Sequence, residues 1–127
     1  MSFVLGTRSL SRLNGVHPDL VRVVKRAIEL TEVDFSVLEG LRTKSRQLTL
    51  VKAGASKTMN SRHITGHAVD LGAYVGGSIR WDWPLYHKIA NAMKKASHEL
   101  KIPIEWGGDW KSFKDGPHFQ LTRRNYP

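Results

Sequence analysis

The chain of 127 residues contains no cysteine, which excludes a disulfide framework and any zinc site built from thiolates. Long apolar runs are also missing. No segment approaches the ~20 apolar residues that span a membrane, and residues 1–16 lack the apolar stretch of a secretory signal peptide. Low-complexity tracts, repeats and linker-like segments are absent as well. We therefore expect one domain over residues 1–127, made in the cytoplasm without a signal peptide and without stable membrane insertion.

Acidic residues are in the minority: 11 Asp and Glu stand against 20 Lys and Arg, a formal net charge of +9. This balance predicts an anionic partner or surface, such as nucleic acid, anionic lipid or an acidic cell-wall polymer. The basic residues are spread along the chain, and no aromatic-interleaved nucleic-acid motif accompanies them. General electrostatic attraction is therefore favoured, and no nucleic-acid partner is expected.

Apolar periodicity predicts two main helices and several short strands. The helices are expected over residues 17–32 and 83–101, each with a proline in its first turn. A short helix is expected before Gly54, and residues 55–66 are typical of a long polar loop. Strands are expected over residues 34–40 and 68–75, within 102–110 where a glycine turn follows, and at the end of 111–122. This pattern predicts an α+β fold.

Polar groups gather in the segment SRHITGHAVD, residues 61–70. Three interpretations compete: a metal site, an acid/base pair, or a polar loop that is rich in histidine. His63 and His67 have the spacing of a helical zinc-binding pair, but a glycine lies between them and no glutamate follows His63. His63 pairs better with Asp70, and His118 from a neighbouring strand could complete the three protein ligands of a catalytic zinc.

A second short motif, DGPH, places Asp115 three residues before His118 with a tight Gly-Pro turn between them. A carboxylate on such a turn can reach a water molecule at the metal and accept its proton as the water attacks a carbonyl. The spacing of these residues alone leaves two interpretations open. They could form a metal centre, or they could be scattered polar residues around two turns, which is the simpler alternative.

The ordered motifs Ser61-x-His63-x-x-Gly66-x-Ala68-x-Asp70 and Asp115-x-x-His118 resemble the signature of the VanY-type zinc peptidases. This family comprises D-Ala-D-Ala carboxypeptidases and phage L-alanyl-D-glutamate endopeptidases, and it shares a fold with the Hedgehog signalling domain. Three further stretches resemble the phage endolysin branch: SRLNGVHPDLVRVVKRAIE, GLRT with the later Gln47, and EWGGDW. The likeness covers roughly residues 10–121. It implies a small antiparallel sheet with two main helices. The length of the chain suits one domain, so no separate cell-wall-binding domain is expected.

The resemblance also implies roles for individual residues. The implied zinc (Zn2+) ligands are His63, Asp70 and His118. Asp115 would be the general base and then the acid, and Arg42 would contact the substrate carbonyl or a substrate carboxylate, where a guanidinium stabilises negative charge. Gln47 and Ser61 would help to hold the substrate or the loop. His67 falls on a variable position of the motif and is left out of the ligand set.

The resulting prediction is a monomeric phage endolysin, a zinc-dependent endopeptidase that cleaves the L-alanyl-D-glutamate bond of the peptidoglycan stem peptide. The positive charge would attract it to an anionic envelope, and the lack of a signal peptide suits holin-type release to the periplasm. The absence of a separate wall-binding domain suggests a Gram-negative host, where the wall is thin. A zinc D-Ala-D-Ala carboxypeptidase on the same scaffold is the first alternative. A non-catalytic basic binding domain is the second, although it would have no need of Asp115. Residues 74–82 are a candidate for a mobile gate over the cleft.

Overall fold

The computed structural model describes residues 3–56 and 58–127. Its strands are β1 (Phe35–Glu39), β2 (Ala68–Val75), β3 (Ser78–Arg80), β4 (Ile104–Trp106) and β5 (His118–Leu121). Its helices are α1 (Thr7–Arg12), α2 (Pro18–Leu30), α3 (Lys44–Lys52) and α4 (Trp83–Leu100), with a short 3-10 turn, η1 (Gly107–Asp109). The strands pair antiparallel in the order β1-β2-β5-β4, and β3 forms a hairpin with β2. The predicted α+β fold with a small antiparallel sheet is confirmed.

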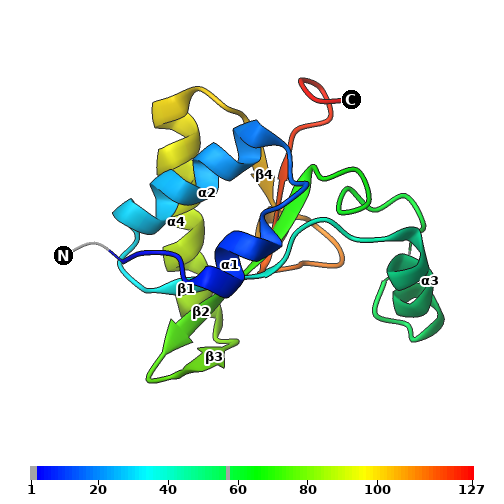
Figure 1. Ribbon diagram of the computed structural model, residues 1–127, viewed down its shortest axis with the longest axis horizontal. Helices are drawn as coiled ribbons and strands as arrows, with labels where there is room; N and C mark the ends of the chain where they lie inside the picture. The colour runs from blue at the N-terminus through cyan, green and yellow to red at the C-terminus, as the bar shows by residue number, and fades with distance from the viewer. Residues whose placement is uncertain (1–2, 57) are drawn as a thin grey trace.

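The core lies between the sheet and the two long helices. Helices α2 and α4 pack against each other, and α4 also contacts β2, whereas α3 stands apart from both (Figure 1). The buried side chains of α2 recur at helical spacing: Leu20, Val23, Val24, Ala27 and Ile28. Burying one Val, Leu or Ile side chain contributes about 1.5–3 kcal/mol, so this stripe fixes α2 against its neighbours. Among the described residues, no helix has the length and apolarity needed to cross a bilayer.

Each long helix has a proline in its first turn, as predicted: α2 begins at Pro18, and α4 begins at Trp83, one residue before Pro84. His17 caps α2, because its Nδ1 accepts a hydrogen bond from the backbone N–H of Asp19 at 3.1 Å. Asp82 occupies the N-cap position of α4, but its side chain makes no capping bond. It accepts a hydrogen bond from Arg80 at 2.7 Å instead.

Helix α1 was not predicted, because its six residues carry no apolar periodicity and no side-chain cap. A tertiary contact holds it in place: the Oγ of Ser9 accepts a hydrogen bond from the backbone N–H of Val37 in β1 at 2.9 Å. Arg12 adds a second contact by donating to the carbonyl of Val37 at 2.9 Å. Local sequence patterns do not reveal contacts of this kind, because the partners are 28 and 25 residues apart.

The pairing of β2 with β5 places two chemically active residues side by side. Asp70 of β2 and His118 of β5 are direct Cα partners in the antiparallel register. Directly opposed residues project from the same face of a sheet with Cβ atoms about 4.5–5.5 Å apart. The register therefore brings together two side chains that are 48 residues apart in sequence.

The turn that leads into β2 depends on Gly66, which has a φ of +77°. A Cβ added there would collide with the backbone carbonyl oxygen of Gly15. We expect Gly66→Ala to lower the free energy of unfolding by roughly 2–4 kcal/mol in urea denaturation, from left-handed strain plus overpacking. Gly54 has the same φ with open space around it, so Gly54→Ala is a matched control that should cost only about 1–2 kcal/mol. Equal losses for the two variants would contradict the collision.

Candidate metal centre

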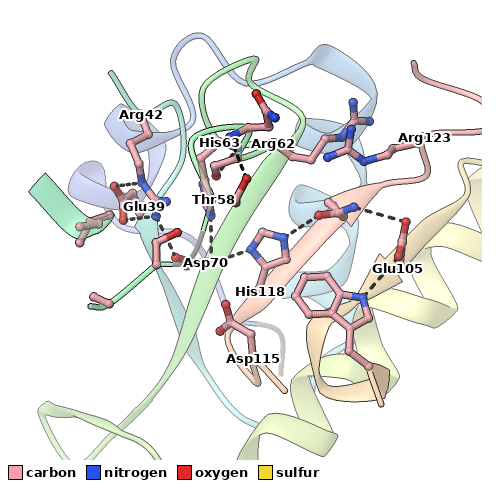
Figure 2. A pocket seen from close by; sticks show the side chains of 17 residues that line it. Glu39, Arg42, Thr58, Arg62, His63, Asp70, Glu105, Asp115, His118 and Arg123 are labelled. Atoms are coloured by element: carbon pink, nitrogen blue, oxygen red, sulfur yellow. Dashed lines mark hydrogen bonds and ion pairs between the residues drawn. The ribbon is translucent and has the colours of Figure 1, made fainter. Parts of the chain in front are cut away.

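Three side chains converge on one point of the sheet: His63 from the loop before β2, Asp70 from β2 and His118 from β5 (Figure 2). The Oδ1 of Asp70 lies 3.2 Å from Nε2 of His63 and 3.3 Å from Nδ1 of His118. All three potential ligand atoms lie within 4.8 Å of one another. Both histidines are buried and Asp70 is half-buried.

The ring orientation of His63 is set by a backbone carbonyl. Its Nδ1 lies 2.9 Å from the carbonyl oxygen of Gly40. Because a carbonyl only accepts, Nδ1 must carry the proton, and the lone pair of Nε2 is then directed at Asp70. A backbone hydrogen bond also holds the main chain of His63 in place, because the N–H of Arg42 donates to the carbonyl of His63 at 2.9 Å.

The ring orientation of His118 is set by a relay of two side chains. Gln120 donates through Nε2 to Oε1 of Glu105 at 3.3 Å, and its own Oε1 lies 2.8 Å from Nε2 of His118. A carboxylate accepts, so the Gln120 amide group faces Glu105 and its oxygen accepts a hydrogen bond from His118 Nε2–H. The Nδ1 lone pair of His118 therefore also faces Asp70.

While both imidazoles are neutral, three acceptor atoms thus meet with no donor among them, which is the arrangement that a bound cation satisfies. Positive charge is favoured even without a metal. Burial opposes charge on His118, but the hydrogen bond and charge of Asp70 outweigh it and raise the pKa of His118. Burial likewise opposes ionisation of Asp70, yet the contacts with His118 and His63 hold its pKa well below the usual range. Two imidazoles and one carboxylate form the three-ligand set of catalytic zinc sites, which leave one position open.

The relay through Gln120 has a measurable consequence. We expect Gln120→Leu to weaken zinc affinity about 10–100-fold, because the His118 ring loses the acceptor that fixes its tautomer and orientation. Competition with a chelating indicator measures this directly. Gln120→Glu keeps an acceptor toward His118 and should retain more affinity than Gln120→Leu. Equal affinity of Gln120→Leu and the unaltered protein would show that the relay does not position the ligand.

Asp115 borders the same cleft from the turn that precedes β5 (Figure 2). Its backbone N–H donates to the carbonyl of Gly107 at 3.0 Å, and its carbonyl accepts from His118 N–H at 3.1 Å. A Cβ at Gly107 would run into Asp115 and His118, so glycine allows this close approach. Burial, and then the charge of Asp70, raise the pKa of Asp115. A carboxyl group with a raised pKa beside a metal site suits both acceptance and return of a proton.

Arg42 is locked in place at the edge of the cleft. Its Nε and Nη2 donate to the two carboxylate oxygens of Glu39, both at 2.7 Å, and its Nη1 donates to Oε1 of Gln47 at 2.8 Å. The Nη2 lies 3.7 Å from Oδ2 of Asp70. The guanidinium is thus directed at the ligand cluster by a paired carboxylate, and Glu39 is a site residue that the sequence interpretation missed.

Gln47 and Ser61 occupy different surroundings. Gln47 is fully buried and does not line the cleft; its Nε2 donates to Ser56 Oγ at 2.8 Å and to the carbonyl of Thr58. In this structure it therefore supports Arg42 and the loop, and contact with the substrate would require that loop to move. Ser61 lines the cleft, and its Oγ accepts a hydrogen bond from His63 N–H at 3.2 Å.

His67 stays outside the cluster. Its Nδ1 pairs with Thr65 Oγ1 at 2.7 Å, and its ring lies 5.6 Å from that of His17.

The cleft has a volume of about 620 Å³ and passes across the ligand cluster. Arg42 and Glu39 lie at one end, and Arg62 and Arg123 lie at the other (Figure 2). None of residues 74–82 lines it; they form the β2–β3 hairpin and the segment before α4. The candidate gate segment therefore does not border the cleft in this structure.

Comparisons with known proteins found relatives over nearly the whole chain. A family model described as phage L-alanyl-D-glutamate peptidase matches residues 1–122. The L-alanyl-D-glutamate peptidase of Escherichia phage T5 is 35% identical over 130 residues, which cover 99% of this chain and 94% of that protein. The crystal structure of the Serratia marcescens L-Ala D-Glu endopeptidase ChiX superposes with a TM-score of 0.92 at 53% identity, covering 98% of this chain and 94% of that one.

A more distant structure shares the fold alone. The vancomycin resistance D,D-dipeptidase VanXYg, solved with a D-Ala-D-Ala phosphinate analogue, has a TM-score of 0.56 at 20% identity, covering 84% of this chain and 50% of that one.

Proposed function

The chain belongs to the phage L-alanyl-D-glutamate peptidase family, and from that premise we propose that it cleaves peptidoglycan with a zinc ion held by His63, Asp70 and His118. It is a peptidoglycan endopeptidase that acts on the L-alanyl-D-glutamate bond of the stem peptide, as its relatives' names state for them. The observation that carries the metal assignment is the convergence of three ligand atoms beside Asp115 in one cleft.

Zinc is the metal that this donor set favours. A set of imidazole nitrogens and a carboxylate oxygen suits zinc. Hydrogen bonds to Gly40 and Gln120 fix the orientation of the two buried rings. A zinc ion held there would supply Lewis-acid chemistry: polarisation of the scissile carbonyl and activation of a water molecule as nucleophile near neutral pH.

The residues of the chain perform the remaining steps. The Asp115 carboxylate accepts the proton of the attacking water and then delivers it to the leaving amine of glutamate. Arg42, fixed by Glu39, presents a permanent positive charge to the oxyanion that develops on the scissile carbonyl. Ser61 supports the loop that carries His63, because it accepts the His63 backbone N–H.

The two alternatives are not favoured. The D,D-dipeptidase neighbour is 20% identical and shows a common fold only, whereas the relatives that match at 35% and 53% identity are named for the L-Ala-D-Glu bond. Because the chain belongs to a family of enzymes, the alternative of a non-catalytic binding domain is not favoured either. We further propose that the enzyme is monomeric, acts in the periplasm of a Gram-negative host after holin-type release, and is drawn to the envelope by its charge of +9.

A lysis assay tests this function. The protein should reduce the turbidity of outer-membrane-permeabilised Gram-negative cells, EDTA should abolish that activity, and added zinc should restore it, because the metal is required for the chemistry. Lysis that persists in EDTA would mean that the positive charge disrupts membranes and that the metal centre plays no part.

A further inference from the structure

Two arginines meet at the end of the cleft opposite Arg42. Arg62 is 6% exposed, and its Nη2 donates to the carbonyls of Leu121 at 3.1 Å and Tyr126 at 2.6 Å. Its Nε is buried without an acceptor in the part of the chain that the structure describes. Arg123 is exposed, and its side chain extends toward the guanidinium of Arg62 (Figure 2). Both residues border the same cleft as the candidate ligands.

This end of the cleft carries unbalanced positive charge. Arg62 and Arg123 both line it, and the carboxylate on the same side of His118 is Glu105 (Figure 2). The carboxylate of Glu105 is already engaged, since its oxygens accept from Gln120 Nε2 at 3.3 Å and from Trp110 Nε1 at 3.4 Å. Two like charges therefore face each other on a wall from which water is partly excluded, where a carboxylate would offset both.

We propose that Arg123, with Arg62 behind it, binds the free carboxylate of the glutamate on the leaving side of the scissile bond. This inference rests on the proposed function. A glutamate within a peptide uses one of its two carboxyl groups to continue the chain, and the other remains an anion. That carboxylate lies three to five covalent bonds from the scissile carbonyl carbon, a span of about 4–6 Å.

Strand β5 connects the ligand cluster to the arginine pair. His118, Gln120 and Arg123 all line the cleft, and Arg123 lies two residues beyond the end of β5. Its side chain extends back toward Arg62, which directly precedes the candidate ligand His63 (Figure 2). A peptide with its scissile carbonyl at the ligand cluster and its leaving side along β5 would carry the glutamate carboxylate toward the arginine pair.

The test compares two soluble stem peptides, one with the free glutamate carboxylate and one with that group converted to an amide. The zinc-loaded full chain is assayed unaltered, as Arg123→Gln and as Arg124→Gln. Arg124 is the matched control, because it is adjacent and exposed but does not line the cleft. Arg62 is left intact, since it also holds two backbone carbonyls.

We expect Arg123→Gln to raise KM about tenfold for the carboxylate peptide, with kcat changed less than twofold, and to leave KM for the amide peptide within twofold. Arg124→Gln should change neither. If Arg123→Gln alters both peptides equally, or if Arg124→Gln matches it, the carboxylate subsite is wrong while the proposed function stands. If the unaltered protein cleaves neither peptide at the L-alanyl-D-glutamate bond, the proposed function fails and the subsite with it.

Discussion

Asp115→Asn is expected to lower kcat on purified peptidoglycan by about 10²–10⁴-fold, the range that a general acid–base group contributes. The substitution keeps the shape of the side chain and removes its capacity to accept a proton. Asp115 is not among the converging ligand atoms, so zinc affinity should change little. The turn should also persist, because its bonds to Gly107 and His118 involve only the Asp115 backbone.

Asp109→Asn is the matched control for this experiment. Asp109 is exposed, pairs with Lys94 at 2.8 Å and does not line the cleft. Its replacement should leave kcat within about twofold, as surface ion pairs contribute little. A similar loss of kcat in both variants, or full activity of Asp115→Asn, would remove Asp115 from the mechanism.

Asp70→Asn is expected to abolish activity and to weaken zinc affinity by more than 100-fold, beyond the range for residues that merely support ligands. Asp70 is the sole anion of the three-residue cluster, and its Oδ1 lies between the two histidine nitrogens. An amide in its place offers zinc a neutral oxygen at best. Isothermal titration with zinc, followed by activity at saturating zinc, measures both effects.

Asp82→Asn is the control here, because Asp82 is exposed and pairs only with Arg80 among the ion pairs of the described residues. It should bind zinc as the unaltered protein does. Zinc affinity of Asp70→Asn within tenfold of the unaltered protein would place the metal elsewhere.

The long helices could be predicted because their stabilising contacts follow local periodicity. The buried positions of α4, such as Tyr86, Ile89 and Met93, recur at helical spacing and are visible in the sequence. Helix α1 could not be predicted, since its partner is β1 and nothing within its own six residues indicates a buried face. Local patterns thus revealed the two long helices, which bury an apolar stripe, and missed α1, which polar tertiary contacts hold.

The candidate ligands could be proposed from sequence because a glycine turn and a strand confine His63 and Asp70 to one short segment. The proximity of His118 required the register between β2 and β5, which sequence spacing does not determine. Their roles as ligands remain a proposal that the zinc titration tests.

The supporting residues were missed for a related reason. Glu39, Glu105 and Gln120 act through side-chain geometry that only the folded structure defines. One signal was available: Gln120 lies two residues after His118 and so faces the same side of the predicted strand. The role of Gln47 could not be resolved either, because burial of its amide against Ser56 is a tertiary property.

The most direct test of the central claim is to identify the bond that the zinc-loaded protein cuts in purified peptidoglycan. Mass spectrometry and amino-terminal analysis of the digest should reveal new amino-terminal D-glutamate and new carboxyl-terminal L-alanine, formed with zinc and absent after its removal. Release of free D-alanine, or cleavage of the L-alanyl-D-glutamate bond that continues after the metal is removed, would contradict the account.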